Sequence, residues 1–228
     1  MTIPSCEAWS NLIRLKKEKD VVGIYISSHP LDDFTHEMKH FMNISLNHLG
    51  DLNPLVNREL NLGGIVNDVQ HLESRNGKGW ARFALEDFTD QYEFRIFGED
   101  YLKYRHFLVV NQFIRIRLSV REGWMNRETG KVGAPRMQFL HFEMLQNTIE
   151  SNAKKLTIQF DIHQLNENQL VALKDNLRSF KGTQSLYFSV YDHRKKVKLV
   201  LNSNKQKVKI TSELLHFLDQ EQCHYKLN

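Results

Sequence analysis

Residues 76–87 read NGKGWARFALED and residues 92–100 read YEFRIFGED, and these two stretches decide the fold. Both alternate apolar residues with arginines or further aromatic residues, the period of two expected of a half-buried strand. The short connection DFTDQ between them predicts a β-hairpin with one face toward a core. The core face would carry Ala81, Phe83, Leu85, Phe94 and Ile96, and the outer face Trp80, Arg82, Arg95 and Phe97.

The hairpin lies within a run of predicted strands between residues 58 and 147. The other elements of this run are one strand before the hairpin, then a short helix and two strands after it, at 60–73, 99–108, 112–124 and 135–145. Gly63 and Gly64 in the first strand indicate a bend or bulge. Five strands with a helix between the third and fourth are the order of an OB-fold, a small Greek-key barrel.

The first 57 residues read as a helical segment. Apolar residues at helical spacing predict a helix over residues 7–22. Pro30 interrupts the pattern, and Asp32 or Asp33 would cap a second helix that runs to about Phe41.

Residues 154–228 read as a small α+β domain, joined to the barrel by a polar linker near 146–154. A strand in LTIQFDI precedes a helix that would begin at Asn166 and end at Gly182. Two strands, QSLYFSVYD and KVKLVLN, follow, and then a short strand KVKI, a helix TSELLHFLDQ and a last strand CHYKL. The whole chain is therefore predicted to be mostly β with α+β: an N-terminal helical segment (1–57), a five-stranded OB-fold barrel (58–147) and the α+β domain (154–228).

Composition excludes several classes of protein. The 228 residues are 41% hydrophobic, enough to bury a core, yet no apolar run approaches the roughly 18 residues of a membrane span. The first residues lack the apolar region of a signal peptide, so a cytoplasmic protein is expected. The two cysteines, Cys6 and Cys223, have no spacing that indicates a disulfide framework or a zinc site.

Motifs for catalysis or cofactor binding are not recognised in the sequence, so we expect no catalytic residues, no metal and no cofactor. The adjacent carboxylates Asp32 and Asp33 would splay apart on a helix, and Glu86 and Asp87 end a strand at a turn; both pairs are interpreted as structural. His36 and His40, at i and i+4, have no third ligand nearby in the sequence and are interpreted as surface or core histidines.

The outer face of the predicted barrel is the candidate site. Single-stranded nucleic acid is held by cations that follow the phosphates and by aromatic rings on which bases stack. The candidate residues are Trp80, Arg82, Arg95 and Phe97 on the hairpin, Arg115 and Arg117 on the fourth strand, Arg75 and Lys78 between the first two strands, and Arg127, Lys131 and Arg136 between the last two. Two structural alternatives stay open: the rings could pack under a neighbouring domain, and Arg82 could pair with Glu93.

The net charge of +4 is mild, but basic residues are dense in HRKKVKLVLNSNKQKVKI, residues 193–210. This stretch could meet an anionic partner, either nucleic acid or an acidic protein surface. It could equally be the solvated face of a hairpin, because its lysines alternate with apolar residues.

Several stretches together resemble one family. EKDVVGIYISSHPLDDF (18–34), GGIVNDVQHLESRNGKGWARFALEDFTDQYEFRIF (63–97) and YLKYRHFLVVNQFIRIRLSV (101–120) resemble the C-terminal region of the bacterial DNA polymerase III alpha subunit. The resemblance covers about residues 7–228. Arg82 departs from the family, where many members carry an apolar or aromatic residue, and strengthens the basic character of the face.

The resemblance implies a non-catalytic replication module, because the family's catalytic domains would precede it. Its OB domain would engage single-stranded template DNA, its C-terminal domain would bind the tau subunit of the clamp loader, and the rest of the alpha subunit would be a further partner. The family's sliding-clamp peptide would fall at or before the first residues, where no copy is recognised. The main alternative is a protein-interaction scaffold whose barrel binds no DNA. An RNA-binding OB domain of a tRNA-processing enzyme is a second alternative, against which the HPL segment (29–31) argues.

Overall fold

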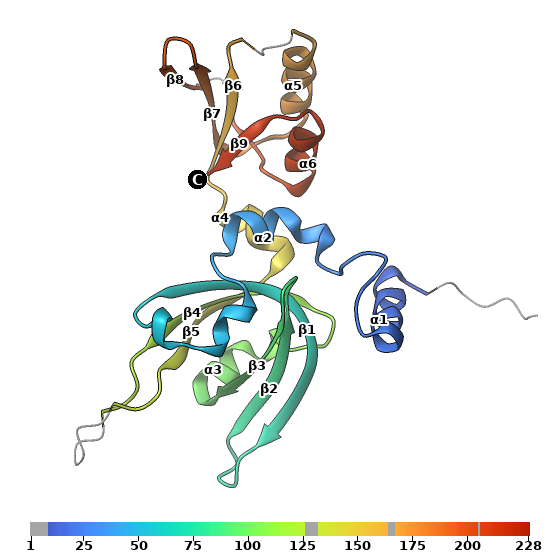
Figure 1. The fold of residues 1–228 in the computed structure, drawn as a ribbon, viewed down its shortest axis with the longest axis vertical. Coiled ribbons are helices and arrows are strands. Elements are labelled where there is room, and N and C mark those ends of the chain that lie inside the picture. Colours follow the sequence, from blue (N-terminus) through green and yellow to red (C-terminus); the bar gives the residue numbers. More distant parts are fainter. Residues whose placement is uncertain (1–8, 126–131, 164–166, 205) are drawn as a thin grey trace, which may run out of the picture. The chain divides into compact units, whose positions relative to one another are not determined.

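The computed structural model describes residues 9–125, 132–163, 167–204 and 206–228 (Figure 1). Contacts divide the chain into two compact units. The barrel unit comprises Met1–Thr35 and Met42–Leu145, and the C-terminal unit comprises His36–Phe41 and Gln146–Asn228. The N-terminal segment, expected to stand by itself, is therefore shared between the two units. None of the helices in the described ranges is long and apolar enough to cross a membrane.

The barrel unit is the predicted OB-fold. Its strands form one antiparallel sheet in the order β3-β2-β1-β4-β5, and the short helix α3 (Gly98–Tyr104) lies between β3 and β4 in the chain. A one-turn 3-10 helix, η4 (Arg105–Phe107), follows α3. The strands are β1 (Glu59–Glu73), β2 (Gly79–Glu86), β3 (Gln91–Phe97), β4 (Phe113–Arg121) and β5 (Arg136–Met144).

The core of the barrel follows the predicted alternation. Phe83 of β2 is fully buried and stacks on Phe94 of β3 with 5.3 Å between ring centroids. On β4, the side chains of Ile114, Ile116 and Leu118 are fully buried. The period of two therefore assigns the inward side of three strands correctly, because each strand has only two faces and one faces the core.

Gly63 and Gly64 were expected to mark a bend or a bulge, and no bulge lies at either glycine. The β1–β4 register is unbroken through both glycines, and the irregularity in β1 falls between Val66 and Asp68. Gly64 has another role: a Cβ there would lie 2.4 Å from the carbonyl oxygen of Glu86. The glycine is required because β2 approaches the backbone of β1 too closely for a side chain.

The N-terminal helices differ in detail from the prediction. Helix α1 (Asn11–Val22) begins after Ser10, whose hydroxyl accepts from the N–H of Ile13, and ends at Gly23 in the left-handed region. The second helix comes in two parts, η1 (Asp32–Phe34) and α2 (Thr35–Phe41), and neither Asp32 nor Asp33 caps α2. Asp32 instead accepts from the N–H of His29 at 2.7 Å. Two 3-10 turns lead into β1, η2 (Leu46–Gly50) and η3 (Asn53–Leu55).

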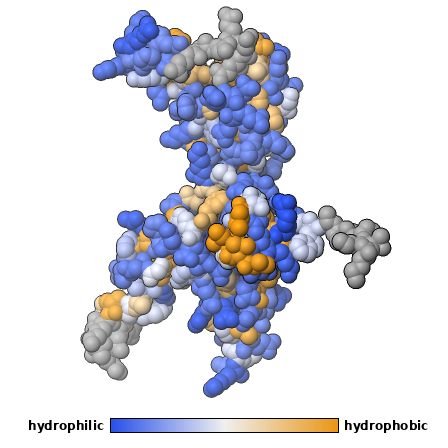
Figure 2. All heavy atoms as spheres, turned by 45° about the vertical axis from the view of Figure 1, so that its right-hand side comes forward, coloured by the Kyte–Doolittle hydropathy of each residue, from blue (hydrophilic) through white to orange (hydrophobic). Residues whose placement is uncertain are grey.

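The N-terminal segment leaves apolar side chains exposed. Of the residues in α1 only Leu15 is buried, whereas Val21, Val22, Ile24 and Ile26 are exposed. Figure 2 shows a largely hydrophilic surface, with a group of hydrophobic residues near the middle of the view. Exposed apolar groups of this kind are typical of surfaces that meet another protein segment.

The C-terminal unit is a four-stranded sheet in the order β8-β7-β6-β9. Strands β6 and β7 are parallel and joined by helix α5, while β7–β8 and β6–β9 are antiparallel. The elements are α4 (Thr148–Asn152), β6 (Lys155–Asp161), α5 (Glu167–Ser179), β7 (Lys181–Asp192), β8 (Val197–Asn202), α6 (Ser212–Gln220) and β9 (His224–Leu227).

Three expectations for the C-terminal unit are wrong. The polar stretch predicted as a linker forms the turn η5 (Leu145–Asn147) and helix α4, where Thr148 and Ile149 are buried. Gly182 does not end α5, which stops at Ser179, but lies in β7. A Cβ at this position would stand 2.4 Å from the backbone nitrogen of Lys209, so a side chain does not fit there. KVKI forms only isolated bridges through Val208. The expected helix start at Asn166 lies outside the described residues.

Candidate nucleic-acid interface

The outer face of β1, β2 and β3 presents three rows of side chains. In an antiparallel sheet, residues directly opposite each other on neighbouring strands share a face and touch. The register therefore fixes which side chains meet. The rows are Leu72–Trp80–Phe97, Gln70–Arg82–Arg95 and Asp68–Ala84–Glu93.

The first row is apolar and aromatic. The rings of Trp80 and Phe97 are stacked, with centroids 5.2 Å apart and planes inclined by 18°. Phe97 is 56% exposed, Leu72 is also exposed, and Trp80 is half-buried. The ring of Phe97 is therefore available for a further stacking partner, and Trp80 supports it from the neighbouring strand.

The second row is cationic, but a carboxylate partly neutralises it. Nη1 of Arg82 lies 3.5 Å from Oε2 of Glu93, and Nη2 of Arg95 lies 3.3 Å from Oε1 of the same residue. The pairing of Arg82 with Glu93 that sequence reasoning left open is present. Arg82 is partly buried and Arg95 is exposed. Because one carboxylate serves both guanidinium groups, one positive charge on this row remains without a counter-charge from Glu93.

The two arginines of β4 have different surroundings. Arg115 donates from Nη1 to Glu143 at 2.6 Å and from Nη2 to Asn61 at 2.7 Å, and its side chain is only 11% exposed. It ties β4 to both neighbouring strands and is poorly placed for a ligand. Arg117, opposite Asn61 and His141, is exposed.

The loops beside this face supply further cations. The turn after β1 is closed by hydrogen bonds between Ser74 and Lys78, with Gly77 at a φ of 70°, and it leaves Arg75 and Lys78 exposed. Figure 1 shows this turn at the tip of the long β1–β2 hairpin. In the β4–β5 connection, Arg127 and Lys131 lie outside the described residues.

Trp124 is a candidate site residue that sequence reasoning missed. It lies in the arm after β4, is 75% exposed, and has the guanidinium carbon of Arg136 3.9 Å from its ring centroid. This cation–π contact joins an aromatic ring to a predicted site cation. The signal available in the sequence was an aromatic residue beside a glycine just beyond a strand with alternating arginines.

The strand-end carboxylates Glu86 and Asp87, interpreted as structural, have structural partners. Glu86 pairs with Lys19 at 2.5 Å and accepts from the side-chain amide of Asn67. Asp87 accepts from the N–H of Leu46 at 2.8 Å and from the N–H of Thr89 at 2.7 Å. Within the described ranges, no three His, Cys, Asp or Glu side chains come together in a way that could hold a metal ion.

The strand order and the helix between β3 and β4 define this part of the chain as an OB-fold, a class that presents the outer face of its second and third strands to ligands. The second unit adds a βαβ crossover with two antiparallel edge strands. Comparison with known proteins identifies the family in which this pair of domains occurs.

The family description "DNA polymerase III alpha subunit, C-terminal domain" matches residues 156–228. The chain is 30% identical to DNA polymerase III subunit alpha of Borreliella burgdorferi over 191 residues, which are 82% of this chain and 16% of that protein. It is 25% identical to the Bacillus subtilis subunit over 186 residues, 80% of this chain and 15% of the relative. The chain belongs to the DNA polymerase III alpha subunit family and corresponds to its C-terminal region, as the resemblance predicted.

Among solved structures, the small single-stranded DNA-binding protein of Streptomyces coelicolor matches with a TM-score of 0.21 and 13% identity. The match covers 38% of this chain and 92% of that protein. Similarity at this level carries no information on what the present chain binds.

Proposed function

We propose that this chain is a non-catalytic part of a DNA polymerase III alpha subunit that binds single-stranded template DNA on its barrel and the tau subunit of the clamp loader on its C-terminal unit. The observation that carries the DNA-binding role is the row of Trp80 and Phe97 directly beside the row of Arg82 and Arg95. The partner role of the C-terminal unit rests on the family alone.

The two rows suit the two parts of a nucleotide. A base can stack on the exposed ring of Phe97, and stacking on a protein aromatic contributes roughly 1–3 kcal/mol per base. Arg95, two residues before Phe97 on the same face of β3, would face the adjacent phosphate. Trp124 with Arg136, and Arg75 with Lys78, would extend contacts along the strand from the two hairpin arms.

The experiment that tests this role compares two matched variants. Phe97→Ala/Arg95→Gln removes one exposed ring and one exposed cation from the site, and Phe88→Ala/Arg178→Gln removes the same groups elsewhere. Titration of a fluorescent oligo-dT should show about a 10- to 100-fold weaker Kd for the first variant, since a stacked base and a phosphate contact are lost together. Matched duplex should bind the wild-type chain less tightly.

Salt dependence separates phosphate pairing from other effects. Loss of one phosphate contact should lower the slope of log K against log salt by about 0.7 for single-stranded DNA. An equal loss of affinity in both variants, or an unchanged slope in the first, would contradict the assignment of this face.

A scaffold role for the barrel is the second candidate, and the pairing of Glu93 with both arginines favours it. If the face packs against protein, the purified chain should not bind oligo-dT even at low salt. Capture of the tau subunit by the C-terminal unit would then be the activity that remains.

A further inference from the structure

Strand β8 forms one edge of the C-terminal sheet. It pairs with β7 from Val197, opposite Asp192, to Asn202, opposite Tyr187, and no strand in the described part of the unit pairs with its other side. Figure 1 shows β8 at the edge of the sheet away from α5 and α6. The backbone N–H and C=O groups on that side of β8 are therefore open to a further strand.

All six side chains of β8 are exposed, and one face of the strand is wholly apolar. Val197, Leu199 and Leu201 point to one face, and Lys198, Val200 and Asn202 point to the other. The exposed fractions of the apolar side chains are 57%, 55%, 47% and 52% in the order Val197, Leu199, Leu201, Val200. An edge strand that only faces water is expected to carry polar residues at most of these positions.

The core side chains that pack against this sheet do not extend over β8. Leu201 lies opposite Phe188 and Leu199 opposite Val190, so these leucines share a face with the side chains that β7 turns toward the unit's core. On that same face of β7, Leu186 is 1% exposed. The core layer therefore protects Leu186 but leaves the leucines of β8 uncovered.

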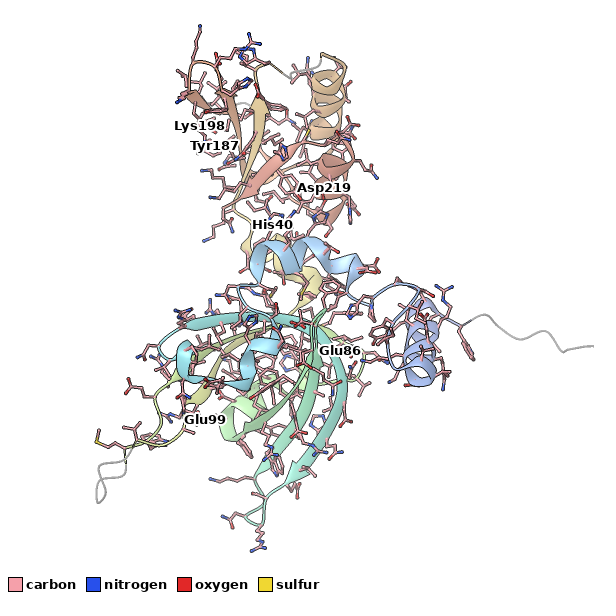
Figure 3. The ribbon with its side chains drawn as sticks, in the orientation of Figure 1. His40, Glu86, Glu99, Tyr187, Lys198 and Asp219 are labelled. Carbon is pink, nitrogen blue, oxygen red and sulfur yellow. The ribbon has the colours of Figure 1, made fainter. Side chains whose placement is uncertain are left out.

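Positive charge surrounds the open edge. The turn between β7 and β8 carries Arg194, Lys195 and Lys196, and Lys198 follows on β8; all four are exposed. Asp192 lies at the base of this turn and accepts from the N–H groups of residues 194 and 195. Lys198, labelled in Figure 3, lies opposite Tyr191 of β7. A second carboxylate, Asp161, lies 2.8 Å from Nδ1 of His193 in the same turn. The four cations exceed these two carboxylates, so the edge favours an acidic occupant.

The chemistry of the edge favours a protein strand over nucleic acid. Nucleic acid would need aromatic or cationic groups at successive positions, whereas four of the six side chains of β8 are aliphatic. An added strand satisfies the open backbone groups and, at the same time, covers the apolar face formed by Val197, Leu199 and Leu201.

We propose that β8 accepts an extended segment of a partner protein as a fifth strand of the sheet, with apolar residues at alternate positions and acidic residues between them. This inference rests on the proposed partner role of the C-terminal unit and assigns that role to one surface. The segment pairs with Val197–Asn202, its apolar side chains cover Leu199 and Leu201, and its carboxylates meet Lys198 and the turn.

The test uses the full chain and a fluorescein-labelled peptide of eight residues in which valine and glutamate alternate. A second peptide has the same sequence but a methyl group on every backbone nitrogen, which removes the N–H donors of both strand edges and keeps the charge. The first peptide should slow hydrogen exchange of the amides of residues 197–202 at least tenfold, and the second should not. If the first peptide leaves these amides unprotected, the proposal is wrong.

Matched variants locate the binding. Leu199→Lys/Leu201→Lys should weaken binding of the first peptide at least tenfold, whereas Val171→Lys, at a 59%-exposed position on α5, should not change it. The two introduced lysines would attract an acidic peptide electrostatically. A loss of affinity in this variant therefore reports the loss of apolar contact, not a loss of charge attraction. Equal affinity in all three proteins would overturn the proposal.

Other occupants give distinct results. If the wild-type chain is a dimer and Leu199→Lys/Leu201→Lys converts it to a monomer, the occupant of β8 is a second copy of the chain. If oligo-dT protects residues 197–202 from exchange, the occupant is nucleic acid. Either result overturns the proposal.

The tau subunit serves as a separate probe. If the wild-type chain and the β8 variant capture tau equally, the proposed function stands but β8 is not the surface that binds tau. If the peptide binds at β8 but the chain does not capture tau, β8 accepts a strand but tau is not the partner.

Discussion

At the scale of single residues, Glu93 decides how strongly the candidate face can attract an anion. Its two carboxylate oxygens lie 3.3 and 3.5 Å from the guanidinium groups of Arg95 and Arg82. A phosphate that binds these arginines must compete with this carboxylate. Exposed ion pairs contribute only about 0–1 kcal/mol to stability, so the competition matters more for binding than for folding.

We therefore expect Glu93→Gln to bind oligo-dT about 3- to 10-fold more tightly than wild type, because removing a charge pair worth about 1 kcal/mol frees both cations. The salt dependence of binding should become steeper. Glu150→Gln is the matched control, since Glu150 pairs with Lys209 at 3.3 Å in the other unit. Unchanged affinity in Glu93→Gln would indicate that Arg82 and Arg95 do not meet phosphate.

At the scale of elements, α2 is held in the C-terminal unit by a buried polar cluster. His36 is 3% exposed, its ring packs on that of His216 with 4.4 Å between centroids, and its Nδ1 lies 3.2 Å from the hydroxyl of Tyr225. The buried Glu37 accepts a hydrogen bond from the hydroxyl of Ser212 at 3.0 Å. His40 on α2 and Asp219 on α6 are labelled in Figure 3.

Burial gives this cluster a pH dependence. Burial, followed by the nearby His216, lowers the pKa of His36 below its ordinary value of 6.5, and burial likewise lowers the pKa of His40. The folded state thus favours the neutral rings, and the unfolded chain takes up more protons as the pH falls below about 6.5. Stability from this packing is present above pH 6.5 and is lost as the pH falls through the folded pKa values.

Other groups that face His36 modify this pH dependence. Asp219, 3.7 Å from Nε2 of His36, opposes the lowering of its pKa, whereas Lys39 adds to it. Burial raises the pKa of Glu37, so its contribution has the opposite sign and is lost as the pH rises through that raised pKa.

We expect the urea midpoint of the C-terminal unit to fall between pH 7.5 and pH 5.5, and to fall less in His36→Gln, where one of the titrating groups is gone. His106→Gln, in the barrel unit, is the matched control and should keep the wild-type slope. Hydrogen exchange of β6 and β9 amides reports the unit selectively. A slope in His36→Gln equal to that of wild type would show that His36 is not the titrating group.

At the scale of the whole molecule, the chain passes between its two units three times. It leaves the barrel unit after Thr35, returns at Met42, and leaves again after Leu145. The C-terminal unit therefore includes six residues that lie more than a hundred positions upstream of its sheet. The matched family description, residues 156–228, omits this part of the unit.

A fragment of residues 146–228 should consequently be less stable than the same unit in the full chain, by about 2–4 kcal/mol, because loss of α2 uncovers a buried cluster and the apolar surface under Phe41. Urea denaturation followed by hydrogen exchange of β6 measures the difference. Addition of a peptide of residues 30–45 should restore part of it. Equal stability of the fragment and the full chain would contradict the assignment of α2 to this unit.

The sequence by itself determined the barrel and the faces of its strands. Alternation in 80–97 and in 113–118 predicted which side chains enter the core, because a strand offers only two faces and burial selects one. The order of five strands and one helix predicted the OB-fold, and the family resemblance followed from the same stretches. Trp80, Phe97 and the hairpin arginines lie on the outer face as this pattern required.

Only the tertiary structure decided which neighbours these side chains have. Arg115 alternates like an exposed residue, yet it is held by Glu143 and by Asn61, 28 and 54 positions away. Gly64 excludes a side chain because of the carbonyl of Glu86, and Glu37 is buried against Ser212, 175 positions downstream. The periodicity of the sequence predicts the face of the strand on which a side chain lies. Charge pairing and close backbone approach depend instead on strand register and on packing between distant segments. Local sequence does not specify either of these.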